Sequence, residues 1–214
     1  MVDTLTLLTF DCWRAAYDDL TDEEQSDYAR HLGREYPDQD RADLLQCERF
    51  FQTIPTVAHV LEIGGWNGRL AAHILNTVPG LRNWTNIDPN ADQEHQTADP
   101  RYLAIVPAFF YWWRYGNYRG YDTLVASHVL EHFKQRDIHE LLAALPDVQA
   151  AYVECPITQT GGNDWAGYDG THILECGWDG LTEVFEDHGF QDRGTHTGDS
   201  RSYRRSHPHH PGAG

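Results

Sequence analysis

Short apolar runs alternate with segments of helical periodicity over most of the chain, and this alternation limits the possible folds more than any other feature. The segment VAHVLEI, residues 57–63, is a largely apolar run typical of a strand that is buried on both faces of a parallel sheet. Four further strands are expected at residues 83–88, 102–106, 121–127 and 149–155. Strands that alternate with helices predict an α/β fold with a doubly wound, mostly parallel sheet and right-handed crossovers.

Helical signals occupy the first 55 residues and the connections between the expected strands. Residues 21–24, Thr-Asp-Glu-Glu, have the form of a capping box. A helix that begins near residues 38–40 carries a stripe at helical spacing, namely Leu44, Cys47, Phe51 and Ile54. The sequence therefore predicts an N-terminal helical extension over 1–55, an α/β domain over 56–205, and a disordered tail rich in His, Pro and Gly over 206–214.

The composition restricts the partners and the compartment of the protein. The formal net charge of the 214 residues is −17, which disfavours nucleic acid because its phosphates would be repelled. No apolar run approaches the roughly 20 residues that span a bilayer. The four cysteines form no C-x-x-C pair. We therefore expect a reduced, cytoplasmic protein with no membrane partner.

The first expected strand ends in a carboxylate and a cluster of glycines. Glu62 precedes Ile63, and the next residues read Gly-Gly-Trp-Asn-Gly, residues 64–68. Glycines after a strand permit a sharp turn and allow a ligand to approach bare backbone amides. The helix that follows presents further unpaired N–H groups. A carboxylate at the strand end is expected to accept hydrogen bonds from a ligand.

A second carboxylate, Asp88, ends the next expected strand. An acid at this place can bind both ribose hydroxyls of a nucleoside. The alternative role is that of a turn-former before Pro89, because Asp-Pro is a common turn. Two strand-end acids with glycines between them favour the ligand role.

Taken in order, four segments resemble the motifs of class I S-adenosylmethionine-dependent methyltransferases. The likeness covers roughly residues 57–190 and is closest to a small-molecule branch whose fourth strand ends in HVLEH. The segments are VLEIGGWNGRLA at 60–71, NID at 86–88, LVASHVLEHF at 124–133 and THILECGWDGLTEVFEDHGF at 171–190.

The resemblance implies a seven-stranded sheet whose last strand is antiparallel to the rest, with FQDRGTHT and SRSYRRS as strands six and seven. It also implies S-adenosyl-L-methionine as the cofactor and a small-molecule acceptor. The implied cofactor contacts are Glu62, Gly64, Gly65, Gly68, Asp88, Ser127 and His128. Glu131 and His132 are expected near the acceptor.

The chain departs from the family pattern at two places. The middle glycine of the family's loop is replaced by Trp66. Its indole either forms one wall of the cofactor pocket or packs on the following helix. The family usually has an acid after the third strand that contacts adenine, whereas this chain has Pro107 and aromatic residues.

The segment AFFYWWRYGNYRGY, residues 108–121, is dense in aromatic side chains. One interpretation places Trp112 and Trp113 in the acceptor pocket, since aromatics line small-molecule sites. The other is ordinary packing between the third and fourth strands. A platform for stacking nucleic-acid bases is disfavoured, because Arg114 and Arg119 are too few to form a basic groove.

Histidines are the candidate general bases, because their pKa lies near neutrality. His132 is the first candidate and His172 the second; for each, the alternative is a hydrogen-bonded structural histidine. No metal site is predicted, since His207, His209 and His210 have no carboxylate or cysteine neighbours in the sequence.

The sequence therefore predicts a methyltransferase that acts on a small molecule, with a hydroxyl acceptor slightly preferred over nitrogen or carbon. A dinucleotide-dependent dehydrogenase would carry G-x-G-x-x-G, which these glycines do not form. The remaining alternative is a catalytically silent relative that binds a nucleoside or a protein partner.

Overall fold

The computed structural model describes residues 37–54, 59–66, 68–88, 97–105, 112–155, 157, 174, 176–197 and 200–206. The expected capping box at residues 21–24, the candidate base His172 and the tail from residue 207 lie outside these ranges.

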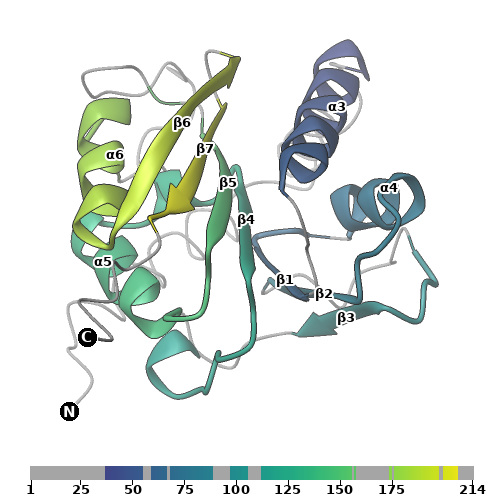
Figure 1. Ribbon diagram of the computed structural model, residues 1–214, viewed down its shortest axis with the longest axis horizontal. Coiled ribbons are helices and arrows are strands. Elements are labelled where there is room, and N and C mark those ends of the chain that lie inside the picture. The colour runs from purple at the N-terminus through teal and green to yellow at the C-terminus, as the bar shows by residue number, and fades with distance from the viewer. Residues whose placement is uncertain are drawn as a thin grey trace, which may run out of the picture.

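A seven-stranded sheet with the order β3-β2-β1-β4-β5-β7-β6 forms the centre of the molecule (Figure 1). Its strands are β1 His59–Ile63, β2 Asn83–Ile87, β3 Tyr102–Ile105, β4 Thr123–Ser127, β5 Ala150–Glu154, β6 Phe190–Thr197 and β7 Ser200–Arg205. Strands β1 to β5 pair in parallel, and β7 is antiparallel to both β5 and β6. The expected doubly wound sheet with one antiparallel strand is confirmed.

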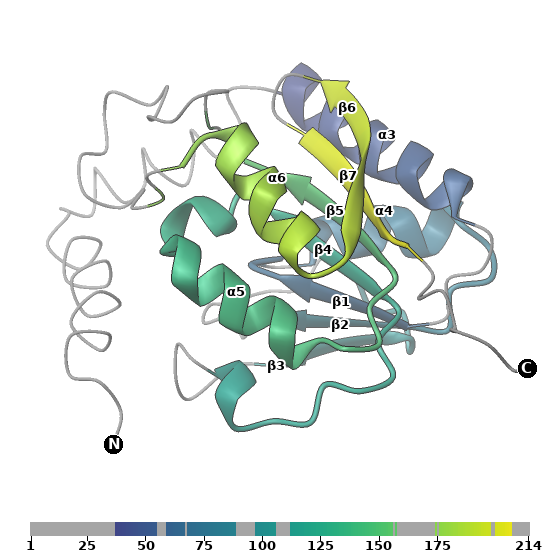
Figure 2. The same ribbon diagram turned by 60° about the vertical axis from the view of Figure 1, so that its left-hand side comes forward.

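Helices cover both faces of the sheet (Figure 2). One face carries α3 (Pro37–Thr53) and α4 (Arg69–Thr77), and the other carries α5 (Gln135–Ala144) and α6 (Trp178–Asp187). Two short 3-10 turns, η1 (Trp112–Arg114) and η2 (Leu130–His132), flank β4. Among the described helices, none has the length and apolar character needed to cross a bilayer.

The apolar strands form two cores because successive side chains point to opposite faces. In β4, Leu124 and Ala126 belong to the core under α5 and α6, whereas Val125 belongs to the core under α3 and α4. Strand β1 divides in the same way, with Leu61 on the first face and Val60 on the second. Burial on both faces explains why these strands read as nearly continuous apolar runs.

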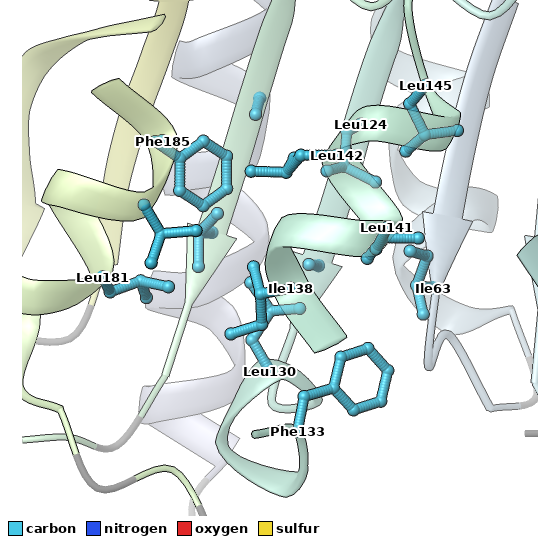
Figure 3. Close-up of a cluster of buried hydrophobic side chains, with 14 of the residues drawn as sticks. Ile63, Leu124, Leu130, Phe133, Ile138, Leu141, Leu142, Leu145, Leu181 and Phe185 are labelled. Atoms are coloured by element: carbon cyan, nitrogen blue, oxygen red, sulfur yellow. The ribbon is translucent and has the colours of Figure 1, made fainter. Parts of the chain in front are cut away.

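Leucine, isoleucine and phenylalanine side chains form much of the core under α5 and α6 (Figure 3). Ile138, Leu141 and Leu142 project from α5 at helical spacing, and Leu181 and Phe185 approach them from α6. The HVLEHF segment also joins this core, because Leu130 and Phe133 are both buried in it. The turn after β4 is thereby anchored.

The predicted stripe on α3 is confirmed where its side chains are described. Cys47 and Phe51 are buried, and the Phe51 ring lies 5.5 Å from that of Trp84 on β2. Phe50, which the stripe did not include, packs 5.6 Å from the ring of Tyr152 on β5. α3 thus contributes to the core of the α/β domain, and the predicted boundary at residue 55 stays a prediction.

Candidate functional site

The carboxyl ends of four parallel strands meet at one edge of the sheet. β1 and β4 are neighbours at the centre, and the chain leaves them toward opposite edges of the sheet. Such a switch point is where ligands bind in doubly wound sheets. The residues that follow the four strands here are Gly64, Asp88, His128 and Cys155.

The backbone amides of the glycine loop are already bonded within the protein. Gly64 N–H donates to the Ile87 carbonyl at 3.0 Å, and Gly68 N–H donates to the Gly65 carbonyl at 2.8 Å. Gly65 N–H donates to Asn86 Oδ1 at 3.0 Å. Trp66 N–H donates to Asp88 Oδ2 at 2.9 Å. The expectation that this loop presents bare amides to a ligand is therefore wrong for these four residues.

The glycines are needed for the loop to pack onto the sheet. Gly64 and Gly68 have φ of 72° and 78°, a region that favours glycine. A Cβ at Gly65 would overlap the Glu62 carboxyl group, and one at Gly68 would lie 2.5 Å from the Tyr102 hydroxyl. The loop accordingly lies tightly over the ends of β1 and β2.

Glu62 lies beneath this loop and is only 1% exposed. Its Oε2 accepts a hydrogen bond from Trp84 Nε1 at 2.7 Å. Burial raises the pKa of Glu62 to about 8, against the smaller lowering effect of that hydrogen bond. The sequence predicts that Glu62 contacts the cofactor directly. In this structure its carboxyl lies against Gly65, and a direct contact with the cofactor stays a prediction.

Asn86 is a site residue that the sequence analysis missed. Besides accepting from Gly65, its Nδ2 donates to the Trp66 carbonyl at 2.9 Å and to the Tyr102 hydroxyl at 3.0 Å. The available signal was an asparagine near the end of an expected strand, since a polar side chain that becomes buried there requires partners. Asp88, 6% exposed, lies two residues further on beside Trp66. These two side chains connect the end of β2 to the loop.

On the other side of β1, Ser127 ends β4 and His128 follows it. Ser127 Oγ donates to Glu154 Oε2 at 2.9 Å, and His128 N–H donates to the Glu154 carbonyl at 2.8 Å. His128 has a φ of 52°, which is unusual for a side chain of its size, and 47% of its side chain is exposed. Buried Glu154 is a second residue that the sequence analysis missed.

The η2 turn brings Glu131 and His132 to the same edge. Glu131 is 1% exposed, and burial raises its pKa to about 8, opposed by hydrogen bonds that include one with Cys155. Its Oε1 lies 4.0 Å from His128 Nδ1. His132 is half-buried, and its N–H donates to the Val129 carbonyl at 3.1 Å.

Trp112 and Trp113 are buried in the core under α5 and α6. The Trp113 ring lies 5.6 Å from that of Phe133, and the Trp112 ring lies 4.6 Å from that of Tyr118. These contacts match the packing interpretation of the aromatic segment. An acceptor contact for either tryptophan stays a prediction.

A carboxylate, a hydroxyl and an imidazole lie at this edge of the sheet, on Asp88, Ser127 and His128. Asp88 lies on one side of the glycine loop, and Ser127 and His128 lie on the other, across the end of β1. Carboxylate oxygens suit ribose hydroxyls. Among the described residues, no group of three or more His, Cys, Asp or Glu is placed to hold a metal ion.

The raised pKa of Glu62 predicts a pH-dependent stability. Between an unfolded pKa of about 4.3 and a folded pKa of about 8, the folded state binds more protons, so stability falls as pH rises through this window. We expect Glu62→Gln to reduce the loss of unfolding free energy over this pH window by roughly a few kcal/mol. Urea unfolding at pH 5, 7 and 9 measures it.

Glu183→Gln, at an exposed carboxyl of α6, is the matched control and should follow the wild-type curve. The raised pKa of buried Glu131 also makes stability fall as pH rises. In Glu62→Gln, the slope of stability against pH is therefore reduced and not abolished. Parallel curves for Glu62→Gln and the wild type would contradict the buried-acid assignment.

Comparisons with known proteins agree with this architecture. A family model described as a methyltransferase domain matches residues 28–193. No curated protein matches the chain. Many solved structures share the fold, among them three with low sequence identity. The methyltransferase SibL in its apo form aligns with a TM-score of 0.64 and 17% identity, over 86% of this chain and 60% of that chain.

Magnesium protoporphyrin IX methyltransferase from Synechocystis PCC 6803 with bound SAH aligns with a TM-score of 0.55 and 16% identity, over 94% of this chain and 96% of that chain. Human N-acetylserotonin methyltransferase in complex with SAM aligns with a TM-score of 0.60 and 16% identity, over 91% of this chain and 59% of that chain. The chain spans about 60% of the length of SibL and of the mitomycin 7-O-methyltransferase MmcR. Because the family model covers more than half of the sequence and the sheet has the expected topology, the chain belongs to the class I S-adenosylmethionine-dependent methyltransferases.

Proposed function

We propose that this protein transfers a methyl group from S-adenosylmethionine to a small-molecule acceptor, with oxygen preferred over nitrogen or carbon as the acceptor atom. The observation that carries the proposal is the position of Asp88. Its carboxylate lies beside the glycine loop at the end of β2, across β1 from Ser127 and His128. This is the switch point of a sheet whose family uses this cofactor.

The residues of the chain have distinct roles in this proposal. S-adenosylmethionine supplies an activated methyl group on a sulfonium, so positioning of the acceptor provides most of the acceleration. Asp88 accepts hydrogen bonds from the ribose hydroxyls. Ser127 and His128 contact the methionine portion, and Glu154 holds Ser127 in place through the 2.9 Å hydrogen bond. Glu62 and Asn86 keep the loop closed over the strand ends.

A small-molecule acceptor is supported by the names of structural neighbours and by charge. The neighbours include a mitomycin 7-O-methyltransferase, a magnesium protoporphyrin IX methyltransferase and an N-acetylserotonin methyltransferase. The net charge of −17 disfavours a nucleic-acid acceptor. The preference for oxygen rests on the candidate bases His132 and His172, because a hydroxyl acceptor needs a base, as a protonated amine also does.

A catalytically silent nucleoside- or partner-binding module is the second candidate. It is favoured by the internal hydrogen bonds of the loop amides and by Trp66 at the middle glycine position. Titration of S-adenosylhomocysteine separates a nucleoside-binding protein from one that binds only a protein partner.

Asp88→Ala tests the cofactor site. We expect wild-type protein to bind S-adenosylhomocysteine in a calorimetric titration. The variant should bind at least about tenfold more weakly, because two charge-assisted hydrogen bonds to ribose are lost. Asp147→Ala, at an exposed carboxylate in the turn before β5, is the control and should bind like the wild type.

Absence of binding heat with wild-type protein at millimolar ligand would overturn the proposed function. Equal affinities of Asp88→Ala and Asp147→Ala would show that ribose is held elsewhere. Because Asp88 also accepts from Trp66 N–H, the thermal midpoint of each variant is measured alongside.

His132→Ala tests the proposed base. The acceptor need not be known, since transfer of a labelled methyl group into the small-molecule fraction of a cell extract measures turnover. We expect the variant to lose about 10²-fold or more in turnover while it retains S-adenosylhomocysteine affinity. His73→Ala, on α4 and paired with Glu48, is the control. Unchanged turnover would make His132 structural and leave His172 as the remaining candidate.

A further inference from the structure

We propose that Trp66 is a cofactor-binding residue that contacts the face of the bound nucleoside and replaces the loop amides as its main loop contact. The inference rests on the proposed function, because it concerns the same cofactor site. It assigns a role to the residue at which this chain departs most from the family's glycine loop.

The backbone at Trp66 is held in a conformation that glycine would adopt more easily. Its φ is 43°, in the left-handed region that is costly for a large side chain. Three hydrogen bonds hold this part of the loop, with Trp66 N–H on Asp88, Asn86 Nδ2 on the Trp66 carbonyl, and Gly65 N–H on Asn86 Oδ1. Strain that the surroundings enforce in this way is typical of functional sites.

Trp66 belongs to neither of the two cores formed by the described residues. Trp66 is 38% exposed, whereas Trp84, Trp112, Trp113 and Trp178 are between 0% and 9% exposed. The buried side of the following helix is formed by Ala71, Ile74 and Leu75 instead. Trp66 is therefore not a core residue of that helix, and its packing on the outside of the helix stays the other interpretation.

The backbone of Trp66 lies beside the proposed ribose site. Its amide nitrogen lies 2.9 Å from Asp88 Oδ2, so a nucleoside held by that carboxylate lies next to this residue. Nucleobases and sugars present flat or apolar faces, and aromatic side chains bind such faces without hydrogen-bond donors.

An aromatic contact also fits the hydrogen bonding of the loop. The amides of Gly64, Gly65, Trp66 and Gly68 all donate within the protein, so none of the four is offered to a ligand in this arrangement. A side chain that binds by stacking compensates for this, and a large apolar surface at the loop gives the nucleoside a contact that a glycine cannot provide.

Three substitutions of Trp66 distinguish the effect of an aromatic face from that of apolar bulk. Calorimetric titration with S-adenosylhomocysteine is performed on Trp66→Phe, Trp66→Leu and Trp66→Gly. We expect Trp66→Phe to stay within about threefold of the wild type, because it keeps an aromatic face. Trp66→Leu and Trp66→Gly should bind about tenfold or more weakly. Ligand-induced change in tryptophan emission should be strong in the wild type and greatly reduced in Trp66→Phe.

The thermal unfolding midpoints distinguish a ligand contact from a purely structural role of Trp66. Trp66→Gly should have a midpoint equal to or above that of the wild type, because glycine relieves the left-handed strain, while its affinity falls. Val78→Ala, at the distant end of α4, is the control, since it loses apolar contact without touching the loop. It should lower the midpoint and leave the affinity unchanged.

The outcomes distinguish this inference from the proposed function. If wild-type protein binds S-adenosylhomocysteine and all three Trp66 variants bind equally well, the inference is overturned and the proposed function stands. Equal affinities of Trp66→Leu and Trp66→Phe overturn the aromatic contact in the same way. If wild-type protein does not bind the ligand, the proposed function falls and this inference falls with it.

Discussion

Hydrogen bonds from the end of β2 to the backbone of the glycine loop are the interaction on which the site depends. Asn86 uses both ends of its amide, and Asp88 adds one carboxylate oxygen. A buried amide that lacked these partners would cost about 1–3 kcal/mol, so loop and strand end stabilise one another. The loop geometry in turn determines where Trp66 projects and how much of Asp88 a ligand can reach.

The same edge of the sheet concentrates features that reduce stability. Glu62 and Glu131 are buried acids whose pKa values are raised by burial to about 8. In the described part of the chain, the non-glycine residues with positive φ are Trp66 and His128, and they lie on either side of β1. Buried acids and strained backbone are tolerated at one edge because α3, α4, α5 and α6 cover well-packed cores elsewhere. This distribution is expected of a ligand site on a rigid scaffold.

Patterns within the sequence predicted the five parallel strands, because buried strands have recognisable local periodicity, whereas the last two strands were expected only from the family resemblance. The run around Leu124 indicated a strand, and the carboxylates at the ends of the first two strands, Glu62 and Asp88, indicated the edge where the strand ends meet. The contacts of the loop could not be predicted in this way. Gly65 meets Asn86 only because β1 and β2 align with Glu62 opposite Asn86, and a pairing register is a property of two strands.

The tryptophans differ in burial, and the sequence alone could not predict which of them are buried. Trp84, Trp112 and Trp66 are chemically identical, yet Trp84 is buried and bonds Glu62, Trp112 packs against Tyr118, and Trp66 is exposed at the loop. Local sequence assigned Trp112 to a pocket as readily as to the core, since aromatic density alone fits both. The distinction needs the three-dimensional position of each ring.

Amide hydrogen exchange of the ligand-free protein, followed residue by residue by NMR, tests the central claim most directly. If side chains of β2 hold the loop, the amides of Gly65 and Trp66 exchange slowly in the wild type, and Gly65 loses its protection in Asn86→Ala. Rapid exchange of both amides in the wild type, at the rate of an open loop, would contradict the account, because the loop would then be free of the strand end.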